Sequence, residues 1–255
     1  MVTYDTIENG RSEFTYRSYS RLMETIDHKR HRVVISDNNS TDKTTVDNLR
    51  LWEEHGAVVI RNDSNLGPAR ATNQSWKLRK PGEHCCKIDN DVYIYGEGWA
   101  DDVEDAFIRD PRIGIIGLKR KDLEQRPGHP NKYFGSTLIM LPHKPGETWL
   151  IFEETPDIIG TCTSFNSSLL DRIGYLYNGK LKYGYEDPLV CHRAHKVGFK
   201  TGFLPHVVID HMDPGGTEYV QWKQTYALLN HHLYVQWLTE LHGGVRSVYC
   251  GPEDE

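Results

Sequence analysis

Short apolar runs alternate with stretches of helical periodicity through the first hundred residues of the chain. The apolar runs, each bounded by polar or turn-forming residues, predict strands at Val2–Tyr4, Val33–Ile35, Ala57–Ile60 and Cys85–Ile88. Apolar spacing and the start and stop signals Pro68 and Gly56 predict helices over residues 12–26, 43–55 and 68–80. This order of strand and helix predicts a mostly parallel central sheet with helices on both faces, whose ligands gather at the carboxyl ends of the strands.

The pattern is less regular beyond Pro111. Apolar runs predict strands at Ile113–Leu118 and Thr137–Leu141, and helices are expected over residues 167–173 and 186–197. Apart from the second of these strands, residues 122–145 match no pattern. Near the end, large apolar side chains recur at three- to four-residue spacing: Tyr219, Trp222, Tyr226, Leu229, Leu233 and Trp237. They predict an amphipathic helix packed on its own domain. We therefore expect two halves of one domain, residues 1–95 and 96–215, and a helical extension, residues 216–255.

Composition places the chain among globular proteins. It has 255 residues, 38% of them hydrophobic and 26% charged, and a formal net charge of -6, which argues against a surface devoted to nucleic acid. The sequence has no run of eighteen apolar residues and no signal-peptide pattern at its start, so we expect neither a membrane span nor secretion. Its five cysteines lack the spacing of a disulfide framework or a zinc site, which favours the reducing cytoplasm.

Two carboxylates follow the strand that ends at Ile88, in the sequence K-I-D-N-D-V-Y-I. Because side chains alternate along a strand, Asp89 and Asp91 are expected to point the same way, and their repulsion would be relieved by a cation. Few, hard oxygen ligands suit Mg²⁺ or Mn²⁺ with positions left open for phosphate oxygens. A surface turn with two solvated aspartates is the alternative.

Two further polar clusters follow predicted strands. In V-V-I-S-D-N-N-S-T-D, Ser40 or Thr41 is expected to cap the next helix, which leaves the Asp37 carboxylate available to accept a hydrogen bond from a base imide N–H. The segment N-L-G-P-A-R, residues 65–70, combines a tight turn, a helix start and a cation, which together suit a nucleotide or diphosphate. Arg70 as an ordinary surface arginine is the alternative.

These motifs, in their order and spacing, resemble a known enzyme family. D-N-N-S-T-D at residues 37–42, N-L-G-P-A-R-A-T-N at 65–73 and D-N-D at 89–91 resemble the family-2 glycosyltransferases with the glycosyltransferase-A fold. Residues 159–162 look like the acceptor-side segment of that family, and residues 183–187, Y-G-Y-E-D, look like its "ED" motif. His211 matches a histidine that often completes the metal site in related enzymes. The resemblance covers about residues 2–213.

The resemblance implies an α/β glycosyltransferase-A fold and a metal-dependent transfer of sugar from a nucleoside-diphosphate sugar to an acceptor hydroxyl, with inversion. Residues 1–95 would bind the donor, and residues 96–215 would bind the acceptor and carry catalysis. The donor-binding residues implied are Thr3, Tyr4, Asp37, Asn39, Asn65, Gly67, Arg70, Lys87, Asp89 and Asn90. The acceptor would meet Gly160, Thr161 and Cys162. Mn²⁺ or Mg²⁺ would be held by Asp91 with Asp89 and His211.

Catalysis is expected to depend on Asp187 as the general base, with Glu186 orienting the acceptor. Asp187 opens a predicted helix, where the dipole favours its ionised form, although a simple helix cap has the same appearance. Asp37 favours UDP, and GDP and dTDP stay open. The sequence also leaves open the oligomeric state and the acceptor. The acceptor is a glycan, a lipid-linked or protein acceptor or a modified nucleic-acid base. The alternatives are a sugar nucleotidyltransferase, which lacks support because no glycine-rich basic loop follows the first strand, and an inactive nucleotide- or carbohydrate-binding module.

Overall fold

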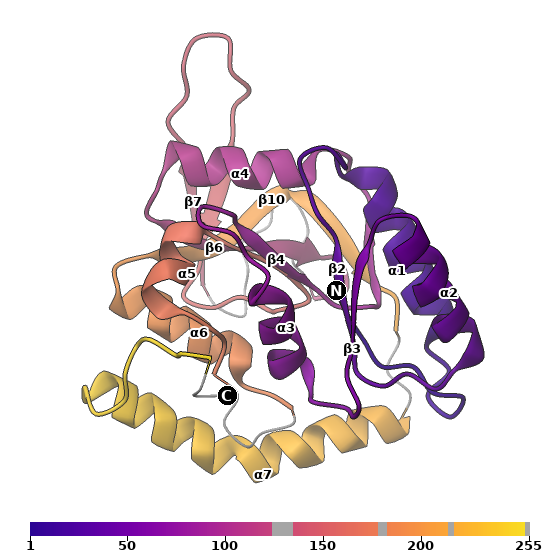
Figure 1. The fold of residues 1–255 in the computed structure, drawn as a ribbon. Helices are drawn as coiled ribbons and strands as arrows, with labels where there is room; N and C mark the ends of the chain where they lie inside the picture. The colour runs from indigo at the N-terminus through magenta and orange to yellow at the C-terminus, as the bar shows by residue number, and fades with distance from the viewer. Residues whose placement is uncertain (124–134, 178–182, 214–216, 253–255) are drawn as a thin grey trace.

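The computed structural model describes residues 1–123, 135–177, 183–213 and 217–252, with residues 217–220 described by their backbone alone. The predicted alternation holds in the first half (Figure 1). Its elements are β1 Val2–Thr3, α1 Ser12–Thr25, β2 Val34–Asp37, α2 Lys43–Glu54, β3 Val58–Arg61, α3 Pro68–Trp76 and β4 Cys85–Ile88. Helix α3 ends at Trp76 and not at Lys80, because the chain turns there and the Leu78 N–H donates to the Ser75 carbonyl at 3.1 Å.

The cap of α2 differs from the prediction. Asp42 is the capping residue, and its Oδ1 accepts from the Thr45 N–H at 3.1 Å. Neither Ser40 nor Thr41 caps the helix, since Ser40 turns back and its hydroxyl donates to Asp37 at 2.5 Å. The correction matters for the site, because it shows that Ser40 belongs to the hydrogen-bonded surroundings of Asp37.

The second half adds mostly antiparallel neighbours to the sheet. Its elements are β5 Val92–Ile94, α4 Trp99–Arg109, β6 Ile113–Arg120, β7 Thr137–Met140, β8 Ile151–Glu154, β9 Cys162–Phe165, α5 Ser167–Ile173, α6 Glu186–Lys196, β10 Lys200–His211 and α7 Thr217–His242. The strand order is β4-β9-β6-β10-β8-β7, and β5 pairs with β10. Only β6 and β10 run parallel among these described pairs. Strand β7 confirms the strand predicted at Thr137–Leu141, within the segment 122–145, and residues 124–134 lie outside the described residues.

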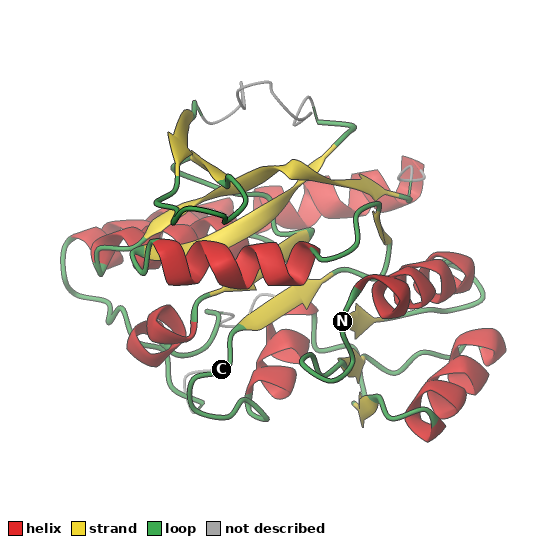
Figure 2. Ribbon diagram, turned by 90° about the horizontal axis from the view of Figure 1, so that it is seen from above, coloured by secondary structure: helices red, strands yellow, loops and turns green. Residues whose placement is uncertain are grey.

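Strand β1 joins the two parts of the sheet. It lies parallel to β2, with Val2 opposite Ser36, and β2 lies parallel to β3. Val2 also forms a parallel bridge with Asp89, directly after β4. The carboxyl ends of β1, β2 and β4 therefore meet at one edge, and helices lie on both sides of the strands (Figure 2). Two large apolar clusters fill the spaces between the sheet and these helices.

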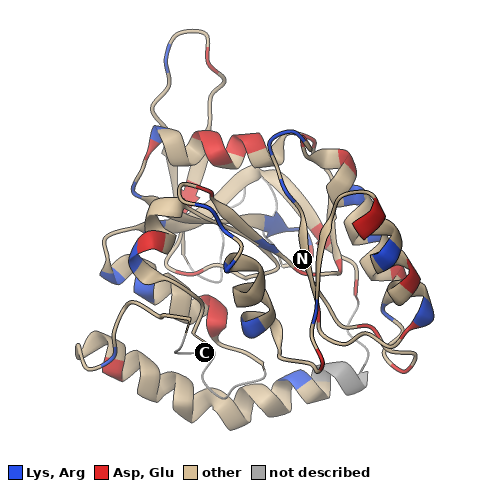
Figure 3. Ribbon diagram, viewed as in Figure 1, with Lys and Arg blue, Asp and Glu red and all other residues tan. Residues whose placement is uncertain are grey.

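Helix α7 extends along one side of the molecule, next to α6 (Figure 1). Trp237 and Leu241 are buried, and Trp237 packs with Leu189 of α6, which confirms the predicted packing for this end of the helix. Trp222 and Leu229 of the predicted stripe are 41% and 61% exposed. The described side chains of α7 carry few charges compared with α1 and α4 (Figure 3). No helix within the described ranges combines the length and apolarity that a membrane crossing requires.

Candidate functional site

The predicted site residues converge on the edge where β1, β2 and β4 end. Asp89 follows β4, and its N–H donates to the Thr161 carbonyl at 3.0 Å, which holds the acid next to β9. The amino end of α6 brings Glu186 and Asp187 to the same place, and the end of β10 brings His211. Segments from both halves of the chain thus form one polar cluster, and Lys87 at its centre connects them.

Lys87 is a buried ammonium between acids from both halves of the chain. Its Nζ donates to the Gly160 carbonyl at 2.8 Å and lies 3.1 Å from Asp89 Oδ1 and 3.9 Å from Asp187 Oδ1. Burial opposes its charge, but Asp89, Asp187 and Glu186 more than offset this and raise the pKa of Lys87. Lys87 therefore stays charged and holds the predicted donor-side acid and the predicted base near each other.

The α6 acids have different environments. The Asp187 Oδ2 accepts from the Gly160 N–H at 3.1 Å, and a Cβ at position 160 would collide with the Asp187 carboxyl group. Glu186 is buried, and this burial, with the neighbouring Asp187 charge, raises the pKa of Glu186 to about 7. The residue before them, Tyr185, has a φ of 69°, which is unusual for a residue with a bulky side chain. Asp187 is thus oriented by a backbone donor, while burial favours the protonated form of Glu186.

Asp91 lies on the other side of the cluster, among cationic and imidazole groups. Its Oδ2 accepts from Arg11 Nη2 at 2.7 Å and lies 3.2 Å from His211 Nε2. Arg11 also forms an ion pair with Asp213, just beyond β10. The other carboxylate oxygen, Asp91 Oδ1, is buried and has no hydrogen-bond partner within the described part of the chain. Such an atom is a candidate ligand atom for a cation.

The surroundings of Asp91 fit a divalent ion. An octahedral ion with bonds of about 2.1 Å holds neighbouring ligand atoms about 3 Å apart, which is near the 3.2 Å between Asp91 Oδ2 and His211 Nε2. Across the described residues no cluster of three or more His, Cys, Asp or Glu side chains is arranged to hold a metal. Asp89 is turned toward Lys87. An ion shared with substrate phosphates needs only one or two protein ligands, with its other coordination positions left for phosphate oxygens and water.

Several of the residues predicted to bind the donor form a hydrogen-bonded cluster around Asp37. The Asp37 Oδ1 accepts from the Thr3 hydroxyl at 2.9 Å and the Ser40 hydroxyl at 2.5 Å, and its Oδ2 accepts from the Ser40 N–H at 3.2 Å. Gly67, with a φ of 82°, follows in the turn that begins α3, and its carbonyl accepts from Asn38 at 3.3 Å. The Asn65 side chain accepts from the Gly67 N–H at 2.9 Å.

The remaining predicted residues take different positions. Tyr4 and Asn39 are exposed, and Arg70 is half-buried on α3. The Asn90 amide donates to Asp5 and Thr15, so this residue fastens the acidic turn to α1. The side chains of Thr161 and Cys162 are buried, so this part of the predicted acceptor segment faces the site through its backbone.

Sequence reasoning did not identify Arg11, Asp213 or Lys223. A single arginine or lysine outside a motif gives no signal, because most such residues lie on the surface. Burial lowers the pKa of Lys223 on α7, and the charges of Asp91, Asp89 and Asp213 oppose that shift. Helix α7 therefore brings a cation within electrostatic reach of the motif acids.

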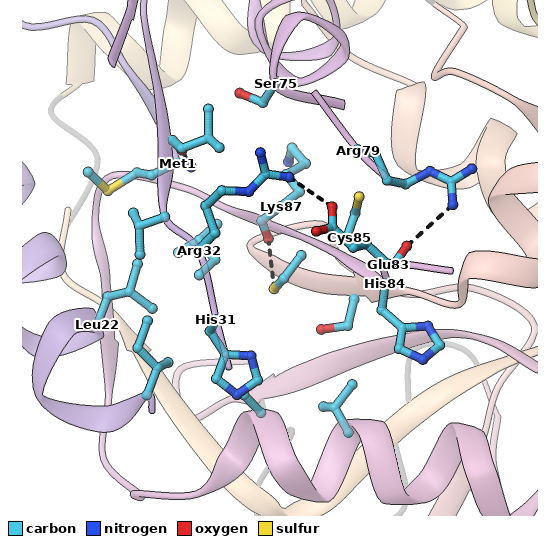
Figure 4. Close-up of a pocket in the computed structure, with 18 of the residues that line it drawn as sticks. Met1, Leu22, His31, Arg32, Ser75, Arg79, Glu83, His84, Cys85 and Lys87 are labelled. Carbon is cyan, nitrogen blue, oxygen red and sulfur yellow. Dashed lines mark hydrogen bonds and ion pairs between the residues drawn. The ribbon is translucent and has the colours of Figure 1, made fainter. Parts of the chain in front are cut away.

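A separate cavity of about 430 Å³ lies between β2 and β4 (Figure 4). Its lining includes Met1, Leu22 and Cys85, and Arg32 forms an ion pair with Glu83 at 2.8 Å beside it. Asp89, Asp91 and Asp187 do not line it. The cavity therefore adjoins the acidic cluster through Lys87, which lines it, and not through these three acids.

The comparisons with known proteins agree with this architecture. The model of "Glycosyl transferase family 2" matches residues 3–174. A mannosyltransferase, PcManGT from Pyrobaculum calidifontis, in complex with GDP-Man and Mn²⁺, is 18% identical with a TM-score of 0.66, over 96% of this chain and 67% of its own. GalNAc-T7 with UDP, GalNAc and Mn²⁺ is 13% identical with a TM-score of 0.61, over 96% and 50%. S. aureus TarS is 19% identical with a TM-score of 0.59, over 89% and 64%.

The chain thus spans between half and two thirds of the length of these three structures. No match was found among curated proteins.

Proposed function

The chain belongs to glycosyl transferase family 2 and has the glycosyltransferase-A fold, and we propose that it transfers a sugar from a nucleoside-diphosphate sugar, with UDP favoured, to an acceptor hydroxyl with inversion. The observation that carries this proposal is the position of Lys87 between Asp89 and Asp187. It puts the donor-side acid and the candidate base within one small site. Residues 1–95 would bind the donor, residues 96–215 the acceptor, and residues 216–255 form an extension.

The hydrogen bonds around Asp37 are evidence for a nucleotide-base site at the carboxyl ends of β1 and β2. Asp37 accepts hydrogen bonds from Thr3 and Ser40, which fix its carboxylate in place, and an imide N–H of uracil would be a further donor to it. The turn at Gly67 and the start of α3 present backbone N–H groups and the Arg70 cation to a diphosphate. We propose that Tyr4, Asn39 and Asn65 also contact the nucleotide sugar.

Asp91 and His211 would hold a divalent ion, Mn²⁺ or Mg²⁺, with Asp89 nearby. Such an ion neutralises charge that develops on a leaving diphosphate. Two of the structures that resemble this chain are complexes with Mn²⁺, which supports a divalent ion here. Arg11 pairs with Asp91, and Lys223 is within electrostatic reach of the same acids, so both cations would add positive charge near the diphosphate.

Asp187 is the base that this site offers to an acceptor hydroxyl. The Gly160 N–H donates to Asp187 Oδ2 and Lys87 Nζ lies 3.9 Å from Asp187 Oδ1, so the carboxylate is held at the site, where it would accept the proton of an acceptor hydroxyl. Attack from the face opposite the diphosphate would then invert the sugar carbon. Glu186, with its pKa raised to about 7 by burial, would orient the acceptor as a hydrogen-bond donor or acceptor.

The change Asp187→Asn tests this assignment. It keeps the shape of the side chain and removes its basicity, so transfer should fall by about a hundredfold or more while nucleotide affinity stays the same. Release of nucleoside diphosphate from UDP-, GDP- and dTDP-sugars with Mn²⁺ would be measured, with water or an added glycan as acceptor, and affinity would be measured by calorimetry. Asp47→Asn on the exposed face of α2 is the matched control.

Unchanged transfer by the Asp187→Asn variant would exclude Asp187 as the base. If the wild type released pyrophosphate in place of a nucleoside diphosphate, the reaction would be nucleotidyl transfer and the proposal would be wrong. If the wild type bound nucleoside diphosphates but consumed none of the sugars, an inactive binding module would be the better description.

A further inference from the structure

The Arg11 guanidinium lies between the Asp91 and Asp213 carboxylates, next to the candidate metal site. It lies at the start of α1, next to Gly10, whose φ is 59°. Its Nη2 donates to Asp91 Oδ2 at 2.7 Å and to Asn90 Oδ1 at 3.0 Å, and its Nη1 pairs with Asp213. All three charged side chains are largely buried, with exposed fractions of 11% for Arg11, 4% for Asp91 and 10% for Asp213.

The acidic turn itself sets the position of this guanidinium. The Asn90 amide nitrogen donates to Asp5 at 3.0 Å and to Thr15 at 2.7 Å, so Asn90 connects the loop before α1 and the first turn of α1 to the D-N-D motif. The Asn90 oxygen then faces Arg11. Arg11 is therefore held by two consecutive residues of the motif, which is a built arrangement and not a chance surface contact.

A guanidinium and a divalent ion compete for the same carboxylate here: Asp91 Oδ2 accepts from Arg11, and Asp91 Oδ1 is the buried oxygen without a hydrogen-bond partner within the described residues. Asp91 Oδ2, which lies 3.2 Å from His211, is also the oxygen that accepts from Arg11. A carboxylate oxygen that binds an ion can keep little of its hydrogen bond to a cation, and two cations this close repel in a poorly hydrated place. Breaking a buried charge pair is unfavourable unless the released charge finds a new partner.

We propose that Arg11 is the resident counter-ion of Asp91 in the metal-free protein, and that it moves from Asp91 to the diphosphate of the donor when the divalent ion binds. This rests on the proposed function. The ion then takes Asp91 and His211, while Arg11 keeps Asp213 on one side and meets phosphate oxygens on the other, for which the guanidinium fork is well shaped. No covalent step is involved.

This arrangement couples the ion to the nucleotide. The ion alone must displace Arg11 without offering it a new anion, so it binds weakly. The ion with a nucleoside diphosphate returns an anionic partner to Arg11, so each ligand strengthens the other by the same factor. The protein would thus avoid a tightly held ion in the absence of donor.

The test is the change Arg11→Met, which keeps much of the side-chain volume and removes the charge. Mn²⁺ binding is measured by electron paramagnetic resonance with the full chain, first alone and then with UDP. Without UDP the Arg11→Met variant should bind Mn²⁺ roughly fivefold more tightly than the wild type, or better, and with saturating Mn²⁺ it should bind UDP roughly fivefold more weakly, or worse. Arg17→Met, an exposed position on the same helix, is the control and should change neither affinity.

Opposite signs in the two titrations support the proposal, because a merely structural arginine would weaken both ligands or neither. Mn²⁺ affinity that is unchanged or weaker in the Arg11→Met variant overturns it, and so does a wild type whose Mn²⁺ affinity is the same with and without UDP. If this variant fails to fold, the wild-type titrations and Arg11→Lys decide, since the lysine substitution keeps the charge without the fork and should show a smaller coupling. Failure of the wild type to bind any nucleoside diphosphate would refute the proposed function, and the metal-only titration would still test Arg11.

Discussion

At the scale of single residues, the site is governed by one buried ammonium among several carboxylates. Lys87 lies between Asp89 and Asp187, and Glu186 has the less favourable place for a charge because it is buried and adjoins Asp187. The sequence could indicate Asp89, Asp91 and Asp187, since a motif match assigns them. It could not indicate which acid would carry a proton, because that depends on burial and on charges from distant segments.

The raised pKa of Glu186 predicts that the stability of the folded protein depends on pH. Its pKa in the folded protein, about 7, lies above the ordinary 4.5, so the folded state holds a proton that the unfolded state releases. The contribution is fully present below pH 4.5 and is lost as the pH rises through about 7. Over that interval it amounts to about 2–3 kcal/mol of unfolding free energy.

The change Glu186→Gln removes this proton and its pH dependence. Urea unfolding at a series of pH values between about 4.5 and about 7.5 should show a shallower decline for the Glu186→Gln variant than for the wild type. Glu54→Gln on the exposed side of α2 is the control and should follow the wild-type curve. Parallel curves for the wild type and the Glu186→Gln variant would show that Glu186 is ionised throughout the interval.

At the scale of elements, α7 supports the segment that leads into the α6 acids. The Tyr185 hydroxyl donates to the Ala227 carbonyl of α7 at 2.9 Å, and its ring stacks on Tyr234 with centroids 4.5 Å apart. Asn230 donates to the Tyr183 carbonyl at 3.0 Å. Because Tyr185 holds a left-handed conformation that is unfavourable by about 1–3 kcal/mol for such a residue, these contacts are needed to keep it there.

The change Tyr234→Ala should therefore slow transfer without weakening donor binding. Loss of the stacked ring releases Tyr185, and Asp187 two residues later loses its orientation, so kcat should fall about tenfold for a loss of about 1.4 kcal/mol. Steady-state kinetics gives kcat, and calorimetry with UDP and Mn²⁺ gives the affinity. Leu228→Ala, at a 78% exposed position of α7, is the control. Weaker UDP binding with an unchanged kcat would place the role of α7 at the donor and not at the base.

At the scale of the whole molecule, the two parts of the sheet differ in how far the sequence determines them. The strands β1, β2 and β3 follow short apolar runs and pair in parallel with neighbours close in the chain, so their periodicity is sufficient to locate them. Strands β8, β9 and β10 pair with segments far along the chain, and polar residues interrupt their apolar patterns. The position of Lys223 and Arg11 beside the motif acids follows only from that tertiary arrangement.

One of those interruptions is an ion pair inside the sheet. Lys119 of β6 and Glu153 of β8 are both fully buried and pair with each other, although β10 lies between their strands. A charged residue in an apolar run argues against a buried strand when the run is considered alone. Here each charge is acceptable because the other strand supplies its partner.

This ion pair predicts that the effects of substitutions at positions 119 and 153 on stability are strongly coupled. Lys119→Met alone leaves the Glu153 charge buried without its ammonium and should lower the free energy of unfolding by about 3–5 kcal/mol. Glu153→Leu alone leaves the Lys119 ammonium buried without this carboxylate and should lower the free energy of unfolding by a similar amount. Since the double change removes both charges, it should be much less destabilising than the sum of the two single changes, and the difference measures the pair.

Urea unfolding of the four proteins gives the double-mutant cycle, and Lys43→Met with Asp47→Leu on the exposed face of α2 provides the matching surface cycle, whose coupling should stay below about 1 kcal/mol. Additive losses at positions 119 and 153 would mean that each charge is stabilised by other groups. A coupling of several kcal/mol would show that the mixed half of the sheet depends on charges whose pairing arises only when β6, β8 and β10 come together.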